Sequence, residues 1–362
     1  MKFLPLTDWG FPMKPMFLGA GPCGAESRQQ ILDTARELRG AGISFLRAGL
    51  WKPRTHPGTF EGVGEAGISW LLEAREQYGM RVAVEVAHPE HVALCRENGV
   101  DIVWIGARTT SSPFAVQSLA DALRETGLPV FVKNPLSPDI ELWIGAIERI
   151  ANAGVQRLGA IHRGFRTARS APYRFSPMWR IPIELRRRFK DLPILCDPSH
   201  LCGRTDLIFN IAQEALDLLY DGLMIEVHIA PHEAQSDAAQ QLTPQEFREM
   251  LNRLTLRRAS VKSDAVLARL RLLRAEVDDL DQDLIELIGR RMAVVREMGG
   301  HKRVHGIPAL QPARWEEIIK SRVAAGRAEG LDGEFLFRLL ELIHEEAIRQ
   351  QERVLQNPPR EE

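Results

Sequence analysis

The 362-residue sequence predicts an α/β fold, a (β/α)8 TIM barrel followed by an all-helical, three-helix C-terminal domain. Short apolar runs recur through about the first 230 residues, and each is followed by an amphipathic segment typical of a helix. From about residue 243 these runs stop, and apolar residues recur at three- and four-residue spacing. We therefore expect a barrel over residues 1–255, a polar linker over 256–264 and a helical domain over 265–362.

Eight apolar runs are the expected strands, because strands of a parallel sheet are buried on both faces and read as continuous apolar stretches. Eight strand–helix units in about 235 residues fit a closed barrel better than an open doubly wound sheet. The first run is also not followed by the G-x-G-x-x-G pattern of dinucleotide-binding folds. The runs are residues 16–21, 44–49, 81–87, 101–107, 129–134, 157–163, 193–200 and 222–228.

The helical part begins with the last barrel helix, which we expect to be capped by Thr243 with Glu246 three residues on. A long helix is expected from about residue 265, and two more at about 313–328 and 332–355. Gly299 and Gly300 are expected to interrupt the long helix, at a cost of about 1 kcal/mol each relative to alanine. The apolar stripe of this helix consists of Leu273, Val277, Leu280, Leu284, Leu287 and Ile288.

The composition excludes several other classes of protein. Lys and Arg number 47 against 48 Asp and Glu, so a net charge of −1 provides no basic field for nucleic acid or a membrane surface. The four cysteines show no disulfide framework, and no run of about 18 apolar residues is long enough to span a bilayer. The first residues lack the apolar core of a signal peptide. We expect a cytoplasmic protein that binds neither nucleic acid nor membranes.

Four potential metal ligands lie near or after the ends of predicted strands, and strand ends of a barrel meet at one rim. Pro198 ends the seventh strand, because proline cannot donate to a sheet ladder, and His200 follows just beyond it. Taken singly, Cys23 could be a buried thiol, His200 a hydrogen-bonded loop histidine and Asp237 a solvated carboxylate. Together, a thiolate, an imidazole and two carboxylates predict a divalent-metal site formed by Cys23, His200, Glu226 and Asp237.

Cationic side chains follow the other strands in the same way. A cation at the end of an apolar strand faces a concave rim and needs counter-ions, so anionic substrates are expected. Arginine suits phosphate and carboxylate because its planar fork bonds them with two donors. The run 186–188, by contrast, is expected on a solvated helix. The candidate substrate-binding cations are Arg47, Lys52, Arg54, Arg108, Lys133 and Arg163, with Thr55 next to Arg54 and Arg166 close to Arg163.

Eight motifs give the first domain a specific resemblance over about residues 14–255: GPCGAES, LWKPRT, IGARTT, VKN, HRGFRT, DPSH, EVH and QSD. In this order they resemble type I 3-deoxy-D-arabino-heptulosonate 7-phosphate (DAHP) synthases. The resemblance implies condensation of phosphoenolpyruvate with erythrose 4-phosphate, the first step of the shikimate pathway. 3-Deoxy-D-manno-octulosonate 8-phosphate synthases share the barrel and the phosphoenolpyruvate site. The KPRT motif favours the four-carbon sugar phosphate, and Cys23 favours metal dependence.

The resemblance also implies roles for the candidate residues. The metal, held by Cys23, His200, Glu226 and Asp237, is expected to be Mn²⁺, with Fe²⁺, Co²⁺ or Zn²⁺ as alternatives. Lys52 is implied as the catalytic proton donor. Arg54 and Thr55 would meet erythrose 4-phosphate, and the residues that would hold phosphoenolpyruvate are Arg47, Lys52, Arg108, Lys133 and Arg163.

The stretch LRAEVDDLDQDLIELIGRRMAVVREMGGHK resembles the first helix of the all-helical chorismate mutases, and the match covers about residues 265–355. It implies rearrangement of chorismate to prephenate, with Arg291, Lys302 and Gln351 as catalytic residues and Arg274 as a further substrate-binding cation. Arg291 and Lys302 are eleven residues apart, about 20° on a helix, so they share a face. Arg274 points about 100° away and is expected to serve the partner's site in an intertwined homodimer.

The helical domain departs from the family pattern at Gln311, Trp315 and Ala347, where many members have Asp, Glu and Ser. Lost hydrogen bonds there would weaken turnover. A second interpretation therefore makes this domain a non-catalytic sensing and dimerising module on an active synthase, and a third makes the barrel a metal-dependent synthase of another sugar acid. On the first interpretation, prephenate is expected to inhibit the synthase through the helical domain.

Overall fold

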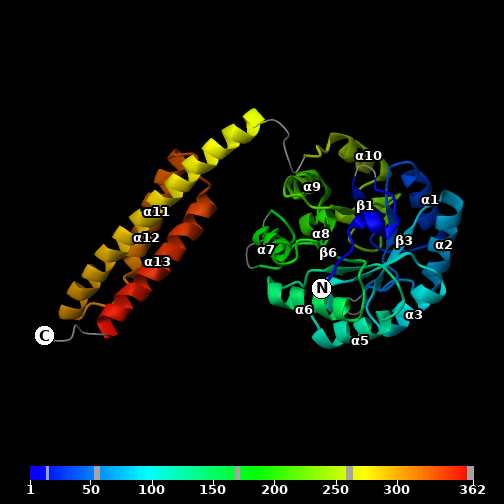
Figure 1. Cartoon of the computed structure of the whole chain (residues 1–362), viewed down its shortest axis with the longest axis horizontal. Helices are drawn as coiled ribbons and strands as arrows, with labels where there is room; N and C mark the ends of the chain where they lie inside the picture. The colour runs from blue at the N-terminus through cyan, green and yellow to red at the C-terminus, as the bar shows by residue number, and fades with distance from the viewer. Residues whose placement is uncertain (14–15, 53–57, 168–171, 258–263, 357–362) are drawn as a thin grey trace. The chain divides into compact units, whose positions relative to one another are not determined.

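A computed structural model describes residues 1–13, 16–52, 58–167, 172–257 and 264–356 (Figure 1). Its eight strands pair in parallel and in sequence order, and β8 pairs with β1 to close the barrel. The predicted fold class is confirmed. The strands are β1 Phe17–Gly21, β2 Phe45–Ala48, β3 Val82–Val86, β4 Ile102–Ile105, β5 Val130–Lys133, β6 Leu158–His162, β7 Ile194–Cys196 and β8 Gly222–Glu226.

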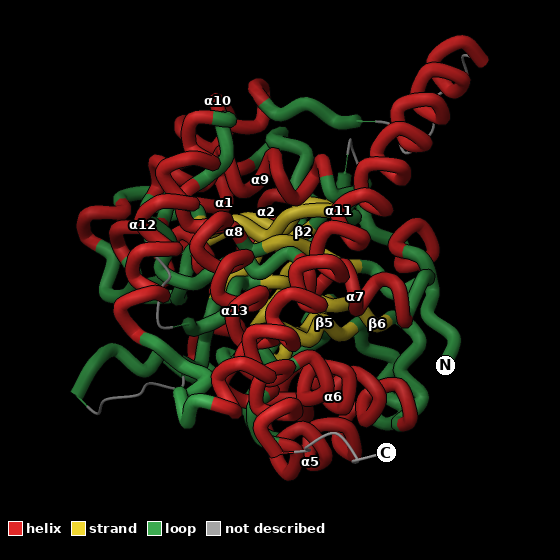
Figure 2. Tube along the Cα trace, turned by 90° about the vertical axis from the view of Figure 1, so that its left-hand side faces the viewer, coloured by secondary structure: helices red, strands yellow, loops and turns green. Residues whose placement is uncertain are grey.

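The strands of the barrel lie together in the turned view, with the barrel helices around them (Figure 2). The longer barrel helices are α1 Arg28–Leu38, α2 Ala66–Tyr78, α3 Pro89–Glu97, α5 Pro113–Leu123, α6 Ile140–Asn152, α7 Arg180–Arg188, α9 Ile208–Asp217 and α10 Pro244–Arg253. Short helices follow β4 and β7: α4 Ala107–Thr110 and α8 Pro198–Cys202. The 3-10 helices are η1 Leu6–Trp9, η2 Thr205–Leu207, η3 Pro231–Glu233 and η4 Ala238–Gln240.

The interior of the barrel is closed at the end where the strands begin. Every strand contributes at least one apolar side chain to one buried cluster, and Leu6 and Trp9 of η1 belong to the same cluster. The Trp9 ring lies 4.9 Å from the ring of Phe131 and 6.1 Å from that of Phe17, both near the start of their strands. The opposite end, where the strands finish, is left for the functional residues.

The segment after β7 is the short helix α8. Pro198 occupies the first position of α8, where its missing N–H costs nothing. Asp197 caps this helix by accepting the backbone N–H of His200 at 3.0 Å. The chain therefore ends the strand, turns at Pro198 and fixes the position of His200 within one helical turn.

The end of the barrel domain follows the predicted capping. Thr243 Oγ1 accepts the backbone N–H of Glu246 at 3.2 Å, and Glu246 Oε2 accepts the N–H of Thr243 at 2.7 Å. This reciprocal pair satisfies two of the unpaired N–H groups at the start of α10. Residues 258–263 of the expected linker lie outside the described residues.

The helical unit consists of α11 Asp264–Val304, α12 Pro312–Ala328 and α13 Gly333–Gln356, as predicted. The expected interruption at Gly299 and Gly300 was wrong, because α11 runs through both. A Cβ on Gly299 would lie 3.3 Å from the Gln351 Cα and from the Val354 Cβ, whereas one on Gly300 would meet nothing within 4 Å. Gly299 thus allows α13 to pack closely on α11.

Contacts divide the chain into two compact units, Met1–Ala259 and Ser260–Glu362. Each unit has its own buried cluster; that of the helical unit is small and contains Met292, Val295 and Ala347. Within the described residues, none of the helices is both long enough and apolar enough to cross a membrane.

Candidate functional site

The four predicted metal ligands lie together at the end of the barrel where the strands finish. Cys23 follows β1, His200 lies on α8 and Glu226 is the last residue of β8. One potential ligand atom from each of these three lies within 4.8 Å of the others. Asp237, just before η4, completes the group, since its Oδ2 lies 3.4 Å from Cys23 Sγ.

His200 is oriented by a carboxylate that the sequence prediction did not include. Its Nδ1 lies 2.8 Å from Asp197 Oδ2, and its Nε2 lies 3.6 Å from Glu226 Oε1. Nε2 is therefore the nitrogen that faces the other ligands, and Asp197 has the position of a carboxylate that orients a metal-binding histidine. Burial opposes a charge on Asp197, but His200 and Lys133 hold its pKa well below the usual range.

The donor set fits a divalent cation. Burial, followed by the charge of Glu226, raises the pKa of the Cys23 thiol to about 12, a situation that a nearby cation would reverse by favouring the thiolate. Glu226 Oε1 is buried and accepts no hydrogen bond from the described residues, although Arg47 Nη2 lies 3.2 Å away. A sulfur, an imidazole nitrogen and carboxylate oxygens suit transition-metal ions better than Mg²⁺ or Ca²⁺.

Two predicted cations lie directly against these ligands. Lys52 Nζ lies 2.6 Å from Cys23 Sγ and 2.9 Å from the carbonyl oxygen of Cys23. Arg47, which is 2 % exposed, donates from Nη2 to the same carbonyl at 3.0 Å. The end of β1 is therefore held between two cations from the end of β2 and the loop after it.

A cavity of about 210 Å³ opens beside the metal-ligand cluster. The predicted residues Lys52, Arg108, Arg163 and Arg166 border it, so cations from three different strand ends face one space. Such a concentration of positive charge around a concave site suits a substrate with phosphate and carboxylate groups. The remaining lining residues are Glu85, Leu136, Arg174, Phe175, His200 and Asp237.

Arg163 is a predicted cation that lines the cavity and keeps a donor that is unpaired within the described residues. Its side chain is buried, its guanidinium lies 3.6 Å from the centre of the Phe175 ring, and burial lowers its pKa to about 10. Arg163 Nη1 is buried and has no hydrogen-bond partner among the described residues. A buried guanidinium in this state is poised to donate to a bound anion.

Lys133 lies deeper than the residues that line the cavity. Its Nζ lies 2.7 Å from Asp197 Oδ2, and both side chains are almost fully buried. This ion pair connects the end of β5 to the residue that orients His200. Arg54 and Thr55, the residues expected to meet the sugar phosphate, lie outside the described residues.

Sequence reasoning missed two charged residues that line the cavity. Glu85 stands inside the apolar third run, where a carboxylate is itself a signal of function. Its Oε2 accepts from Trp104 Nε1 at 3.0 Å, and a Cβ on Gly106 would lie 2.0 Å from its Oε1, so a side chain at position 106 would displace this carboxylate. Arg174, which lies 3.0 Å from Asp237 Oδ1, follows no strand, and the sequence carries no signal for it.

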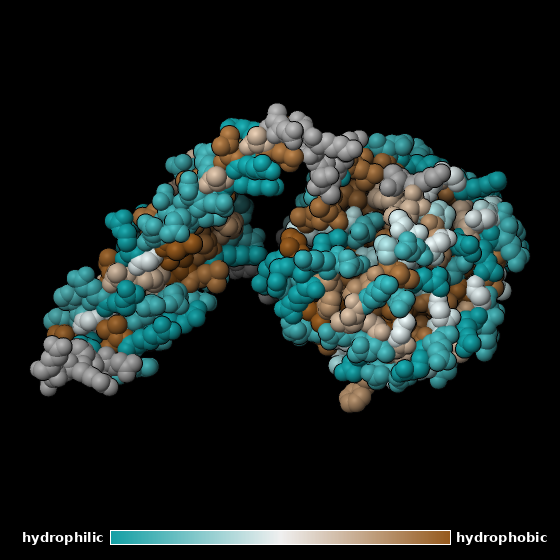
Figure 3. Space-filling model, viewed as in Figure 1, coloured by the Kyte–Doolittle hydropathy of each residue, from teal (hydrophilic) through white to brown (hydrophobic). Residues whose placement is uncertain are grey.

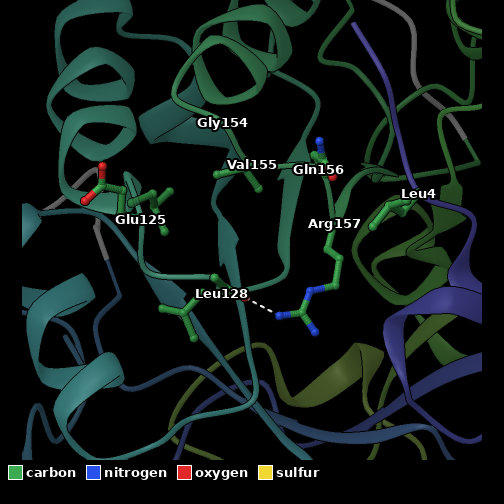
Figure 4. A pocket seen from close by; sticks show the side chains of 9 residues that line it. Leu4, Glu125, Leu128, Gly154, Val155, Gln156 and Arg157 are labelled. Carbon is green, nitrogen blue, oxygen red and sulfur yellow. Dashed lines mark hydrogen bonds between the residues drawn. The ribbon is translucent and has the colours of Figure 1, made fainter.

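A larger cavity, of about 330 Å³, lies at the other end of the barrel (Figure 4). Residues that precede β5 and β6, such as Leu128 and Gln156, line it together with Leu4. Arg157 borders it and donates to the carbonyl of Gly127, the contact drawn as a dashed line. None of the predicted site residues lines this cavity.

The helical unit gathers three of its predicted residues. Lys302 and Gln351 are buried, 8 % and 6 % exposed, and Arg291 is half-buried. Arg291 Nη1 and Gln351 Oε1 are buried atoms without a hydrogen-bond partner in the described part of the chain. Burial, followed by the charges of Arg291 and Lys302, lowers the pKa of His344. Buried polar atoms without a partner are unusual in folded proteins, and a polar ligand that binds here would pair with them.

Arg274 does not lie with these residues. It is on the exposed part of α11, and the 17 positions that separate it from Arg291 correspond to about 25 Å of helix. At the three departures from the family pattern, Gln311 precedes α12 without a side-chain cap, and Ala347 is buried against Met292 and Val295. The Trp315 ring stacks on His344, with ring centres 4.1 Å apart.

The two units match different protein families. The DAHP synthetase I family model matches residues 13–260, and the chorismate mutase type II model matches residues 273–352. A 4-amino-4-deoxychorismate mutase of Streptomyces venezuelae is 37% identical over 87 residues, which cover 24% of this chain and 84% of the relative.

Relatives of the barrel agree with this assignment. A phospho-2-dehydro-3-deoxyheptonate aldolase of Thermotoga maritima is 36% identical over 235 residues, which cover 65% of this chain and 68% of the relative. A crystal structure of a DAHP synthase from the same organism has a TM-score of 0.60 at 33% identity and covers 66% of this chain and 67% of the other. The family matches support both activities, DAHP synthesis and chorismate rearrangement. The chain therefore belongs to the DAHP synthetase I family and carries a type II chorismate mutase domain after its barrel.

Proposed function

We propose that the barrel site condenses phosphoenolpyruvate with erythrose 4-phosphate to form DAHP. The observation that carries this proposal is that the metal-ligand cluster and the cation-lined cavity share residues: His200 and Asp237 belong to both, and Lys52 touches Cys23. A substrate anion bound in the cavity would lie against the metal ligands. Phosphoenolpyruvate, with a phosphate and a carboxylate, matches the charge of this cavity.

The proposed cofactor is a divalent metal, Mn²⁺ first, with Fe²⁺, Co²⁺ or Zn²⁺ as alternatives, held by Cys23, His200, Glu226 and Asp237. When bound, the ion supplies a Lewis acid for the aldehyde oxygen of erythrose 4-phosphate. The protein's own contribution is a fixed set of donors, because Asp197 holds the His200 ring and Glu226 keeps one oxygen without a hydrogen bond from the described residues.

The cations position phosphoenolpyruvate so that its C3 faces the aldehyde carbon, which is catalysis largely by orientation. Arg108 and Arg163, which border the cavity, would bind it directly. Arg47 and Lys133, near the ends of β2 and β5, would add positive charge beside the site. Lys133 has three donors and can share them between Asp197 and the substrate. Water then adds at C2 and phosphate leaves, and the same cations stabilise the charge that develops.

Lys52 is the proposed proton donor of the barrel reaction. Its ammonium group borders the cavity and lies 2.6 Å from Cys23 Sγ, so it reaches both the substrate space and the metal ligands. From this position it can donate to the oxygen that forms when the aldehyde carbon is attacked. Arg54 and Thr55, which follow it closely in the chain, are proposed to hold the phosphate of erythrose 4-phosphate.

The helical domain is proposed to rearrange chorismate to prephenate. This reaction needs a compact conformer of a dicarboxylate, and Arg291 and Lys302 supply cations for it. Lys302 and Gln351 would also donate to the ether oxygen as negative charge builds on it. Gln351 Nε2 makes only a 3.3 Å hydrogen bond to the carbonyl of Ala347, so this N–H can turn to a ligand.

A second candidate substrate is 4-amino-4-deoxychorismate, because the Streptomyces venezuelae relative carries that name. Chorismate and its amino analogue share both carboxylates and differ in one polar substituent. Measuring the turnover of chorismate and of its amino analogue on the same preparation decides which of them is the substrate. A third outcome, turnover of neither, favours the non-catalytic interpretation to which Gln311, Trp315 and Ala347 point.

The deciding experiment measures both reactions on one preparation, with and without a chelator. Chelation should abolish DAHP formation and added Mn²⁺ should restore it, while chorismate rearrangement should continue because it needs no Lewis acid. Cys23→Ala should lose the metal-dependent reaction only. Full synthase activity in metal-free Cys23→Ala protein would contradict the assigned metal centre.

A further inference from the structure

Two neighbouring glutamines, Gln240 and Gln241, lie beside the metal-ligand cluster and have no role in the mechanism described above. Both side chains are 1 % exposed. They follow Asp237, whose φ of +51° is in the left-handed region that aspartate tolerates better than most residues. The chain therefore turns sharply between a metal ligand and two buried amides.

Gln240 holds one oxygen of Glu226. Its Nε2 donates to Glu226 Oε2 at 2.7 Å, and its Oε1 accepts from Arg174 Nη1 at 2.7 Å. A carboxylate only accepts and a guanidinium only donates, so the two partners fix the orientation of the amide. Glu226 Oε1 is thereby the oxygen that faces His200 Nε2, 3.6 Å away.

The same chain of contacts reaches Asp237. Arg174 Nη1, already bonded to Gln240, also lies 3.0 Å from Asp237 Oδ1, which leaves Oδ2 facing Cys23 Sγ at 3.4 Å. A continuous path therefore runs from Glu226 through Gln240 and Arg174 to Asp237. It holds the outer oxygen of each carboxylate and turns the inner one toward the cluster.

Gln241 holds the third ligand through its backbone. Its Oε1 accepts the N–H of Cys23 at 2.8 Å, and its Nε2 donates to the carbonyl of Ser236 at 2.9 Å. The end of β1 is thus attached to the residue that precedes Asp237. The oxygen and the nitrogen of each amide therefore both have a partner, as is usual for buried polar groups.

We propose that Gln240 and Gln241 are positioning residues that set the metal affinity of the barrel site. They fix Glu226, Asp237 and Cys23 before a cation arrives, so the cation does not have to order them. The inference rests on the proposed metal centre. Partners of metal ligands typically change affinity 10- to 100-fold when they are replaced, and a change of that size is expected here.

The first test is the dissociation constant of Mn²⁺ for the metal-free full-length protein, measured by competition with a chelating dye. Gln240→Met keeps the length of the side chain and removes both hydrogen bonds, so binding should weaken about 10- to 100-fold. Gln245→Met is the matched control: this glutamine is exposed on α10, where it donates to Glu249, and its replacement should leave Mn²⁺ affinity unchanged.

The second test reads Cys23 directly. Co²⁺ bound to a thiolate gives a near-ultraviolet charge-transfer absorption. Gln241→Met, which frees the backbone N–H of Cys23, should shift or weaken this band, and Gln245→Met should not. If the two glutamines were only structural, replacing them would lower the melting temperature. Both the Mn²⁺ affinity and the Co²⁺ spectrum would then stay as in the wild type.

The outcomes separate this inference from the function on which it rests. A wild-type protein that binds no Mn²⁺ would show that the metal centre itself is wrong. Wild-type binding together with an unchanged affinity in Gln240→Met and an unchanged spectrum in Gln241→Met would overturn the positioning role. Should Gln240→Met fail to fold, Gln240→Asn takes its place, because this shorter amide stays polar but does not reach Glu226. Unchanged Mn²⁺ affinity in Gln240→Asn would overturn the proposal equally.

Discussion

Arg163 is the single residue from which the substrate assignment of the barrel can be tested most directly. It lines the cavity, and its buried Nη1 has no hydrogen-bond partner in the described residues. With a pKa of about 10 it stays charged at neutral pH. Arg163→Ala should remove a charge-assisted contact of about 1.5–3 kcal/mol, which lowers kcat/KM for phosphoenolpyruvate roughly 10- to 150-fold.

The control for Arg163 is Arg124→Ala. Arg124 is an exposed arginine that caps the C-terminal end of α5 and pairs with Asp121 on the surface. Its removal should leave synthase kinetics unchanged, because exposed pairs contribute little. Steady-state kinetics with phosphoenolpyruvate as the varied substrate make the comparison. Identical kinetics in the Arg163→Ala and Arg124→Ala proteins would assign Arg163 a structural role.

His162 predicts how the stability of the barrel depends on pH. It is fully buried on β6, and its Nδ1 lies 3.0 Å from the hydroxyl of Tyr220. Burial lowers its pKa from 6.5 to about 3. The folded chain keeps this imidazole neutral, whereas the unfolded chain binds a proton to it below pH 6.5. The free energy of unfolding should therefore fall as the pH falls from 6.5 toward 3. This group contributes up to about 4 kcal/mol to that decrease.

The matched pair for this prediction is His162→Gln and His232→Gln. Glutamine does not titrate, so the slope of unfolding free energy against pH should flatten between pH 4.5 and 6.5 in His162→Gln. His232 is 80% exposed, and its replacement should leave the slope as in the wild type. Urea unfolding at a series of pH values measures both. Equal slopes in all three proteins would show that His162 titrates normally in the folded state.

At the scale of elements, the packing of α13 on α11 depends on one glycine. Gly299→Leu should push the helices apart, because even a Cβ there would lie 3.3 Å from Gln351 Cα. Gln351 belongs to the proposed mutase site, so chorismate rearrangement should fall while DAHP synthesis stays near normal. Gly300→Leu, where a Cβ meets nothing within 4 Å, is the control and should gain up to about 1 kcal/mol of helix stability.

Assays of both reactions on the two variants decide this prediction. Equal mutase activity in Gly299→Leu and Gly300→Leu would mean that the close approach of the two helices is not required for the site. A loss of both activities in Gly299→Leu would instead point to general misfolding of the chain. Thermal unfolding of each variant separates a packing defect from a change in helix propensity.

The elements themselves could be predicted from sequence because each carries a local signal. An apolar run such as 222–228 needs no partner to be recognised, and the capping pair Thr243 and Glu246 is three residues apart. The strand ends then placed Cys23, His200 and Glu226 on one rim through topology alone. Prediction from local pattern therefore reached the residues that end strands.

The rest of the site could not be predicted because it depends on contacts between distant, irregular segments. Arg174 reaches Asp237 from a segment between β6 and α7, and 63 residues separate the two in sequence. Gln240 meets Glu226 after a turn at Asp237, whose backbone is left-handed. The continuous α11 shows the opposite error: two glycines lower helix propensity, but packing against α13 outweighs that cost.

At the scale of the whole molecule, the exposed face of α11 predicts a homodimer. Apolar side chains, drawn in brown in Figure 3, gather along part of the surface of the helical unit among teal hydrophilic ones. Long stretches of exposed apolar surface mark association sites. Replacing two of these side chains, Leu280→Glu with Leu284→Glu, should convert a dimer to monomers. The stripe includes Leu273, Val277, Leu280, Leu284 and Leu287, all between 39% and 62% exposed.

Light scattering after size-exclusion chromatography measures this change in mass. Arg274 adds a functional reading: if it serves the partner's site, Arg274→Ala should lose mutase activity while remaining a dimer. Mixing Arg274→Ala with Arg291→Ala protein should then restore part of the activity, since one mixed site would contain both arginines. Absence of any restoration in confirmed mixed dimers would place Arg274 outside the active site.

The last prediction concerns why the two domains share one chain. Prephenate is made downstream of DAHP, so a domain that binds prephenate can report the supply of the pathway. The motivation is a site for a dicarboxylate, Arg291 with Lys302, on a unit that is separate from the barrel but covalently attached to it. We expect prephenate to inhibit the synthase through this domain.

Binding at a separate unit can change the barrel's activity only if prephenate prefers an arrangement of domains or protomers in which the synthase works less well. If the inhibition acts by weakening substrate binding, linkage requires the barrel's substrates to weaken prephenate binding by the same factor. Arg291→Ala should abolish mutase activity and prephenate inhibition together, and leave uninhibited synthase activity near normal. Inhibition that persists in Arg291→Ala, or in a chain ending at Thr255, would place the effector site in the barrel, and the two domains would then be joined for a reason other than feedback.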